Sequence, residues 1–144
     1  YRMAYTVMGD AVNLGSRLEG LTKAYGAEIL VSEASQKQAP EFLYRRIDKV
    51  QVKGKTEPIT ILEPMMHREQ ATQSDFKLAQ LLDLSFEYYS QQDWENALKS
   101  LDEIIQIQQE NYLHIAALFK ERISEFQSSP PPTNWDGVFR HTSK

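Results

Sequence analysis

Near the start of the chain, an amide and a guanidinium stand four residues apart, at Asn13 and Arg17. On a helix this spacing places both side chains on one face, about 40° apart around the axis. A packed helix that holds them side by side presents a rigid set of hydrogen-bond donors, which suits ribose and phosphate oxygens better than an apolar ligand. A solvated helix edge explains the same spacing, so spacing alone leaves both interpretations open.

A lysine on a tight turn is the second candidate, Lys53 in the sequence Lys53-Gly54-Lys55. A cation in such a turn can lie over a polyphosphate and offset its repulsion, and Gly54 gives the turn its conformational freedom. An ordinary exposed turn explains the same residues. Asp10 is better interpreted as a helix N-cap than as a metal ligand, and the three His residues lack the spacing of a metal site.

The elements that would carry these residues follow from the apolar pattern of the first half. A β-prone run at residues 5–8 precedes Asp10, after which apolar residues recur at three- and four-residue spacing as far as Tyr25. Gly26 then stands where a left-handed C-cap would end the helix. A further strand, a short helix and a hairpin complete the order β-α-β-(α)-β-β, which predicts an α+β layer. These last elements are expected at residues 28–32, 33–38, 42–52 and 59–62.

The second half predicts only helices, at residues 76–91, 94–108 and 112–126. Asp93 and Asn111 are the expected N-caps of the last two helices. The first two helices should form an antiparallel pair that resembles one tetratricopeptide repeat, with the third helix as a cap. Three consecutive prolines exclude a helix at the start of the final stretch, where Trp135 is expected to anchor an extended tail over the helices.

Residues 5–19 carry a resemblance to a known family. Their pattern is an aromatic residue, Thr6, two apolar residues and then Gly-x-x-Val-Asn-x-x-x-Arg, and it resembles the strand-turn-helix of class III adenylate and guanylate cyclases. Val52-Lys53-Gly54-Lys55 looks like the hairpin near the end of that catalytic domain, and Leu30-Val31-Ser32-Glu33 matches a frequent family segment. The resemblance covers about residues 1–64, and Thr6 is typical of a large, mainly bacterial subgroup that makes cyclic AMP.

This resemblance implies roles for four residues. Asn13 orients the ribose, and Arg17 stabilises the charge that builds on the α-phosphate as the ribose 3′-oxygen attacks. Thr6 reads the purine edge, which favours ATP as the substrate, and Lys53 reaches the triphosphate. The family reaction uses two Mg²⁺ or Mn²⁺ ions, whose Asp ligands are expected upstream of Tyr1. The family's site is composite, so a homodimer partner is implied, and this segment alone is expected to be inactive.

The resemblance and the helical pattern of the second half together predict a division of the chain. Residues 1–66 would be the second half of a ferredoxin-like cyclase domain, residues 67–74 a linker, residues 75–127 an all-α three-helix tail, and residues 128–144 a Pro-rich extended segment. The tail has a weaker resemblance to bacterial cyclases with membrane-bound sensor domains, which implies such domains upstream of a cytoplasmic catalytic part. Two alternatives stay open, an inactive cyclase homology domain that dimerises or senses nucleotide, and a helical protein-docking adaptor.

The composition of the chain limits the classes of molecule that are expected to bind it. The first 68 residues carry a net charge of +2 and the remainder a net charge of −6. A mildly basic first half suits a polyphosphate, but it lacks the clustered Lys and Arg of nucleic-acid-binding proteins, so DNA and RNA are not expected as partners. No run approaches the roughly 18 to 20 consecutive apolar residues of a transmembrane helix, so no membrane contact is expected from this segment. The chain has no Cys, which excludes disulfides and thiolate metal sites.

Overall fold

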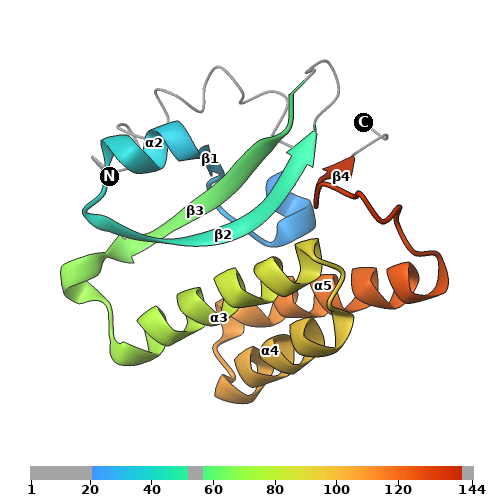
Figure 1. The fold of residues 1–144 in the computed structure, drawn as a ribbon. Coiled ribbons are helices and arrows are strands. Elements are labelled where there is room, and N and C mark those ends of the chain that lie inside the picture. Colours follow the sequence, from blue (N-terminus) through green and yellow to red (C-terminus); the bar gives the residue numbers. More distant parts are fainter. Residues whose placement is uncertain (1–20, 52–56, 141–144) are drawn as a thin grey trace.

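The computed structural model describes residues 21–51 and 57–140. They form a mixed sheet and a layer of helices that lies against it (Figure 1). After a helical stretch at residues 21–25, the elements are, in order, β1 (Val31–Ser32), α2 (Glu33–Gln38), β2 (Phe42–Gln51), β3 (Ile59–His67), the 3-10 helix η1 (Arg68–Gln70), α3 (Gln73–Ser90), α4 (Trp94–Ile107), α5 (Glu110–Ser128) and β4 (Phe139–Arg140). The predicted α+β class is confirmed.

The antiparallel hairpin of β2 and β3 forms the centre of the sheet, whose strand order is β1-β3-β2-β4. Val50 pairs with Ile59 on the two sides of residues 52–56, so the predicted hairpin is confirmed. A register shift between Arg46 and Asp48 interrupts the ladder. Such bulges re-aim side chains, and here the consecutive residues Ile47 and Asp48 both contact the helical layer.

β1 is shorter than the five-residue strand that the sequence predicts. The amides of Glu28 and Ile29 donate to the Oε2 atom of Glu63, at 2.7 and 3.4 Å. The Glu63 side chain therefore accepts the two hydrogen bonds that carbonyl oxygens of a neighbouring strand would accept in a regular sheet. Of the five residues predicted as this strand, Val31 and Ser32 pair with β3.

The predicted linker, residues 67–74, overlaps regular structure at both of its ends, since β3 ends at His67 and α3 begins at Gln73. β3 continues past the predicted end at residue 62 as far as His67, because the start of β2 pairs with it and the rings of Phe42 and His67 lie 4.4 Å apart. Thr72 begins α3 with a capping box, in which its hydroxyl accepts from the Asp75 amide and the Asp75 carboxylate accepts from the Thr72 amide. This arrangement satisfies two backbone donors that helix termini leave free.

The second and third long helices differ in how their N-termini are capped. Asp93 caps α4 as predicted, since its carboxylate accepts from the Asn96 amide at 3.3 Å. The prediction of Asn111 as the N-cap of α5 is wrong, because Gln109 occupies that position and no side chain caps the helix there. Asn111 lies in the first turn, where its carbonyl oxygen accepts from Arg45 of β2 at 2.6 Å. α4 runs back along α3, as expected for the predicted pair (Figure 1).

One apolar core joins the sheet to all three long helices. On the sheet side it contains Leu21, Tyr25, Leu30, Ile47, Val50 and Ile61, and on the helix side it includes Leu78, Tyr89, Leu101, Ile104, Ile115 and Ile123. A smaller cluster on the other face of the sheet includes Val31, Ala39, Phe42, Tyr44 and Leu62 and packs next to α2. The helices of the second half thus cover one face of the hairpin, while the division of the chain into separate units stays a prediction.

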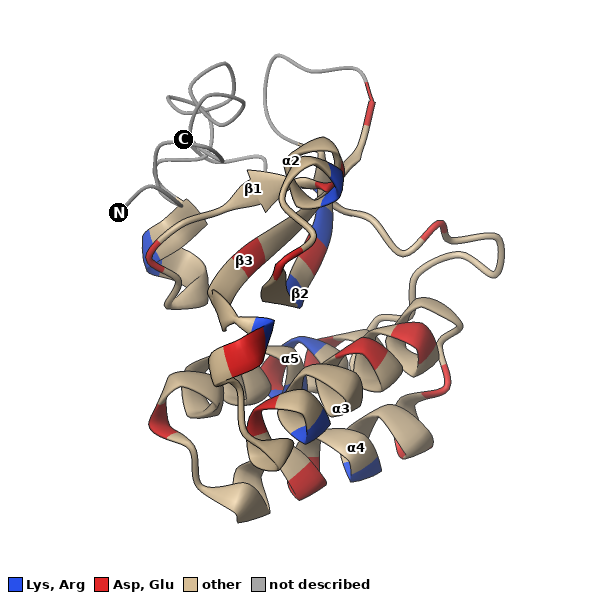
Figure 2. Ribbon diagram, turned by 90° about the vertical axis from the view of Figure 1, so that its left-hand side faces the viewer, with Lys and Arg blue, Asp and Glu red and all other residues tan. Residues whose placement is uncertain are grey.

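The three long helices contain more acidic than basic residues. Figure 2 shows Asp and Glu prevailing over Lys and Arg along α3, α4 and α5, in agreement with the acidic composition of the second half. Among the described residues, none of the helices combines the length and apolar character needed to cross a bilayer.

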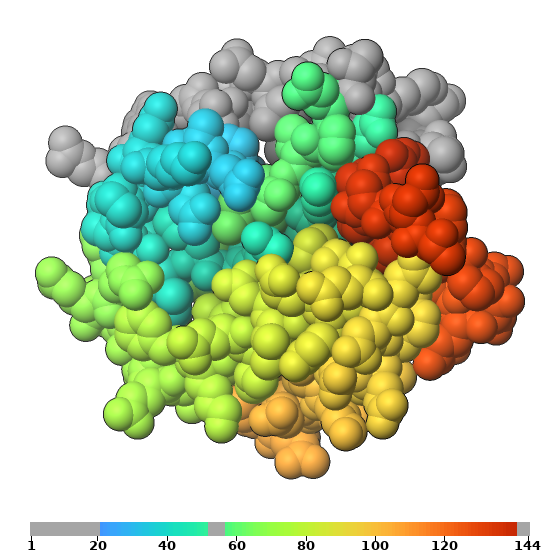
Figure 3. All heavy atoms as spheres, in the orientation of Figure 1, coloured from blue at the N-terminus to red at the C-terminus, as the bar shows by residue number. Residues whose placement is uncertain are grey.

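The final described stretch packs back over the end of the helices and the end of β2 (Figure 3). Trp135 contacts the rings of Tyr89, Trp94 and Phe126, with centroids 5.2 to 6.3 Å apart, so the predicted anchoring role of Trp135 is confirmed. The sequence did not predict β4, which pairs in parallel with Val50 and Gln51 of β2. The C-terminal segment therefore contacts both layers.

Candidate functional site

The four predicted site residues, Thr6, Asn13, Arg17 and Lys53, lie outside the described residues, so their roles stay predictions. The structure does describe the elements that adjoin them in the chain. The helical stretch 21–25 follows Arg17 by four residues, and it ends at Gly26, which has the predicted left-handed backbone (φ +66°). β2 and β3 flank Lys53. The contacts that fix these adjoining elements therefore bear on where the predicted site residues can lie.

A buried polar cluster connects both adjoining elements to the helical layer. Arg122 of α5 donates from Nη1 to Asp48 Oδ2 of β2 at 2.7 Å, and the Tyr25 hydroxyl donates to the same oxygen. The amide of Lys49 donates to the other carboxylate oxygen at 2.8 Å. Arg122 also donates to the hydroxyls of Tyr89 and Tyr25, at 3.2 and 3.5 Å. Asp48 is 0% exposed and Arg122 8% exposed, so water contributes little to this cluster.

Electrostatics favours a single protonation state for the two phenols and the guanidinium of this cluster. The pKa of Tyr25 is raised well above its ordinary value, first by burial and then by the neighbouring carboxylate of Asp48. The pKa of Tyr89 is raised as well, mainly by burial. Burial acts against the charge of Arg122, but Asp48 and the two tyrosines together outweigh it and raise the pKa of the guanidinium. The phenols stay protonated and the guanidinium stays charged near neutral pH, which suits a fixed structural cluster and not proton transfer.

A second buried ion pair ties β2 and β3 to the start of α5. Arg45 and Glu63 are cross-strand partners, and Arg45 donates to Glu63 Oε1 from Nε at 3.0 Å and from Nη2 at 2.7 Å. The remaining nitrogen of the guanidinium donates to the carbonyl oxygen of Asn111, and its carbon lies 5.0 Å from the Tyr112 ring centre. Every described buried side-chain polar atom has a hydrogen-bond partner, so these charges are compensated where they lie.

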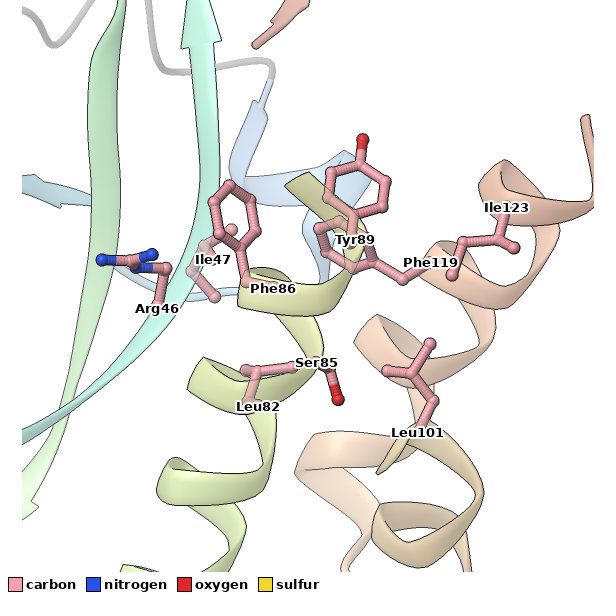
Figure 4. Close-up of a pocket in the computed structure, with 9 residues that line it drawn as sticks. All are labelled: Arg46, Ile47, Leu82, Ser85, Phe86, Tyr89, Leu101, Phe119 and Ile123. Atoms are coloured by element: carbon pink, nitrogen blue, oxygen red, sulfur yellow. The ribbon is translucent and has the colours of Figure 1, made fainter. Parts of the chain in front are cut away.

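The cavity between β2 and the helices is too small for a ligand. Its volume is about 10 Å³, which is at the limit for a single water molecule. Figure 4 shows the residues of β2, α3, α4 and α5 that line it: Arg46, Ile47, Leu82, Ser85, Phe86, Tyr89, Leu101, Phe119 and Ile123. This space is a packing defect of the core and cannot admit a nucleotide.

A larger groove of about 450 Å³ lies between α2, the start of β2, η1 and α3. Its volume falls in the range of small-molecule sites. Its strand residues are Phe42, Leu43 and Tyr44, whereas Lys53 follows the opposite end of β2. Ten residues of strand separate the two ends by about 30 Å. The groove is therefore not adjacent to the point where β2 leads into the predicted phosphate-contacting turn.

The described residues contain no group of three or more His, Cys, Asp or Glu side chains that could hold a metal ion. Asp48 is committed to Arg122 and Tyr25, and Glu63 to Arg45 and two backbone amides. The donor set of this part of the chain therefore does not fit a two-metal site. The predicted Mg²⁺ or Mn²⁺ ions, with ligands outside this chain, stay a prediction.

The sequence pattern does not predict the buried polar residues. It shows Tyr25 only as a member of an apolar stripe, and Asp48 and Arg122 lie in a strand and a helix without a motif. His114, to which the sequence assigns no chemistry, has a structural contact, since its Nε2 lies 2.9 Å from the carbonyl oxygen of Ala24. β2 contains four charged residues, Arg45, Arg46, Asp48 and Lys49, among its apolar and aromatic residues. The side chains of Arg45 and Asp48 are the two that lie buried, and a buried charge requires a partner.

Comparison with known proteins finds three that are similar to part of this chain. The adenylate cyclase of Anabaena cylindrica is 54% identical over 66 residues, covering 43% of this chain and 13% of that protein. The terminal-differentiation-specific adenylate cyclase of Dictyostelium discoideum is 47% identical over 66 residues, covering 43% of this chain and 3% of that protein. Adenylate cyclase 1 of Rhizobium meliloti is 40% identical over 63 residues, covering 43% of this chain and 10% of that protein.

No family model and no solved structure matches the chain. The chain spans between 3% and 13% of the length of these curated relatives, so their likeness concerns one short segment. The matched length of 63 to 66 residues is close to that of residues 1–64, which carry the cyclase-like motifs. The likeness to three proteins named adenylate cyclase supports a place for this chain in a cyclase family.

Proposed function

We propose that this chain is part of a nucleotidyl cyclase that converts ATP into 3′,5′-cyclic AMP and pyrophosphate in signal transduction. The observation that carries the proposal is the 54% identity over 66 residues with a protein named adenylate cyclase. The motif at residues 5–19 and the Lys53 turn support it, because both occur in the order and spacing of the cyclase pattern. The Thr at position 6 favours adenine over guanine.

In the proposed reaction, the ribose 3′-oxygen attacks the α-phosphorus in line with the bond to pyrophosphate, which breaks. The 3′-hydroxyl gives its proton to solvent water, and pyrophosphate leaves with the bonding electron pair. Arg17 offers a fixed cation to the α-phosphate oxygens, whose negative charge grows in the transition state, so its interaction is stronger there than in the ground state. Asn13 holds the ribose, and Lys53 offsets the charge of the triphosphate.

We further propose that the site forms between two copies of the chain in a homodimer. A long and solvent-accessible nucleotide needs donors from more than one direction, and Asn13 and Arg17 lie on a single predicted helix. The remaining groups, including ligands for two Mg²⁺ or Mn²⁺ ions, would come from a partner subunit and from sequence outside this chain. The active form is therefore expected to be larger than these 144 residues.

The test is a cyclase assay on the full-length polypeptide that contains this chain, with ATP and GTP as alternative substrates. Arg17→Ala should lower turnover of ATP by about a hundredfold or more while leaving folding nearly unchanged, because it removes a transition-state contact. Arg140→Ala is the matched control, since it makes the same change in a side chain that is 53% exposed. Unchanged turnover in Arg17→Ala would refute the assignment.

The same assay distinguishes the alternative of an inactive cyclase homology domain. A full-length protein that binds ATP but forms no cyclic nucleotide would have that function. A protein that neither binds nor converts ATP, while residues 75–144 capture a partner protein, would be a helical adaptor.

A further inference from the structure

We infer that Arg122 is a positioning residue for the proposed cyclase reaction. From α5 it holds the two elements that adjoin the predicted nucleotide-contacting residues, β2 through Asp48 and the helical stretch 21–25 through Tyr25. This inference rests on the proposed function. It assigns to the C-terminal helices a part in the geometry of the site, although none of their residues belongs to the cyclase-like motifs.

The first link runs to the helical stretch. Tyr25 is eight residues after Arg17, and the sequence predicts one continuous helix from Asp10 to Tyr25. Eight residues of helix span about 12 Å, so a shift at Tyr25 would be carried to Arg17 almost undiminished. α5 holds this stretch at two points, because His114 contacts the Ala24 carbonyl while Arg122 and Asp48 bind the Tyr25 hydroxyl.

The second link runs to the hairpin. Asp48 is the last charged residue of β2 with a buried side chain, and it stands five residues before Lys53. Its two carboxylate oxygens accept from Arg122, Tyr25 and the Lys49 amide. One carboxylate thus fixes the strand, the helical stretch and α5 relative to one another.

Two further contacts restrain the guanidinium. Its carbon lies 3.6 Å from the centre of the Phe139 ring, and Nη1 also donates to Tyr89 of α3. Phe139 belongs to β4, which pairs with the end of β2. A planar guanidinium presents its donors in a rigid fork, which a lysine cannot reproduce. The burial of the cluster makes any alternative arrangement costly, because a displaced charge would lose its partners without gaining water.

Positioning of this kind affects turnover more than folding. A misplacement of about 1 Å remote from the chemistry can cost about a hundredfold in rate. Loss of one hydroxyl at Tyr25 removes a single link without removing apolar volume, so a smaller displacement and about a fivefold loss of kcat are expected. Loss of the guanidinium releases both links, and about a twentyfold loss is expected.

The experiment measures kcat, KM for ATP and the folded fraction of the full-length protein, at a temperature well below its unfolding transition. The variants are Tyr25→Phe, Arg122→Met and the double variant Arg122→Met with Asp48→Leu, which replaces the ion pair by an apolar pair and should restore much of the stability. Lys120→Met is the matched control, two residues away on α5 with a side chain that is 39% exposed. Per folded molecule, the three test variants should have lower kcat, and the control should equal the wild type.

A purely structural role gives a different result. The double variant would then regain wild-type kcat together with its stability, which would overturn the inference. Combining Arg122→Met with Arg17→Ala gives a second criterion, since effects that act through the same group are less than additive, and full additivity would also overturn it. Wild-type protein that forms no cyclic nucleotide would overturn the proposed function itself. An active wild type with unchanged test variants would overturn only the role of Arg122.

Discussion

α5 carries two ion pairs of equal length in opposite environments, and this contrast allows a quantitative prediction. Arg122 and Lys120 each place a nitrogen 2.7 Å from a carboxylate oxygen, of Asp48 and Asp102 respectively. The side chains of the first pair are 8% and 0% exposed, and those of the second are 39% and 56% exposed. Replacing each cation by Met removes the charge and keeps an apolar side chain of similar length.

The expected costs differ because only one of the two carboxylates is left without water. In Arg122→Met, Asp48 keeps the Tyr25 hydroxyl and the Lys49 amide but loses its cation in a buried site, which typically costs about 3–5 kcal/mol in the free energy of unfolding. In Lys120→Met, Asp102 is rehydrated, and surface pairs of this kind contribute about 0–1 kcal/mol. We expect Arg122→Met to be destabilised by at least 2 kcal/mol more than Lys120→Met.

Urea denaturation followed by circular dichroism measures both free energies of unfolding for residues 1–144. Raising the ionic strength supplies a second comparison, because salt should weaken the exposed pair and leave the buried pair nearly unaffected. Costs that agree within 0.5 kcal/mol would refute the burial argument, as would an equal response of both pairs to salt. If Arg122→Met does not fold, Arg122→Lys, which keeps a charge at the site, should fold with an intermediate stability.

Three further predictions concern other parts of the fold. Gly26→Ala should lower the free energy of unfolding by about 1–3 kcal/mol in urea denaturation, since Gly26 has φ +66° and a Cβ there would lie 2.9 Å from the His114 ring. Thr72→Ala should cost about 1 kcal/mol by removing the α3 cap, with Thr72→Ser as a control that keeps it. Burial raises the pKa of Tyr112 to about 12. Its contribution to stability is therefore complete below pH 10 and lost as the pH rises through 12, and thermal melts between pH 9 and 12 should show a flatter decline in Tyr112→Phe.

The pattern of apolar residues was enough to predict most elements because each long element has a periodic face. The α2 and α4 boundaries, the hairpin and the end of the first helix at Gly26 follow from local signals. The errors lie where a distant group decides the outcome. The length of β1 depends on the carboxylate of Glu63, which is more than thirty residues away. In the first turn of α5, the carbonyl oxygen of Asn111 accepts a hydrogen bond from the guanidinium of Arg45 on β2. Neither partner can be identified from local sequence.

The candidate site likewise contains some residues that local sequence predicts and others that it does not. Asn13, Arg17, Thr6 and Lys53 could be predicted because they belong to motifs with fixed spacing, although they lie outside the described residues. The cluster of Arg122 could not, since its members come from four segments that only the tertiary fold brings together. A charged residue in a helix such as α5 is usually exposed, and nothing in its neighbours distinguishes Arg122 from Lys120.

The shared core determines how the two halves of the chain can act on each other. Residues of α3, α4 and α5 cover Ile47, Val50 and Ile61 on one face of the hairpin. Wherever a boundary is drawn, separating the two halves would therefore expose this apolar face. The same interface contains the two buried arginines of the described residues, and each bonds across it, Arg45 from β2 to the start of α5 and Arg122 from α5 to β2. Apolar contacts alone would tolerate small sliding of the helices over the sheet, whereas two directional charged contacts at separate places on α5 permit a single register. A signal that moved α5 by a fraction of a turn would have to break both contacts, and it would reach the strand before Lys53 and the helical stretch after Arg17 together.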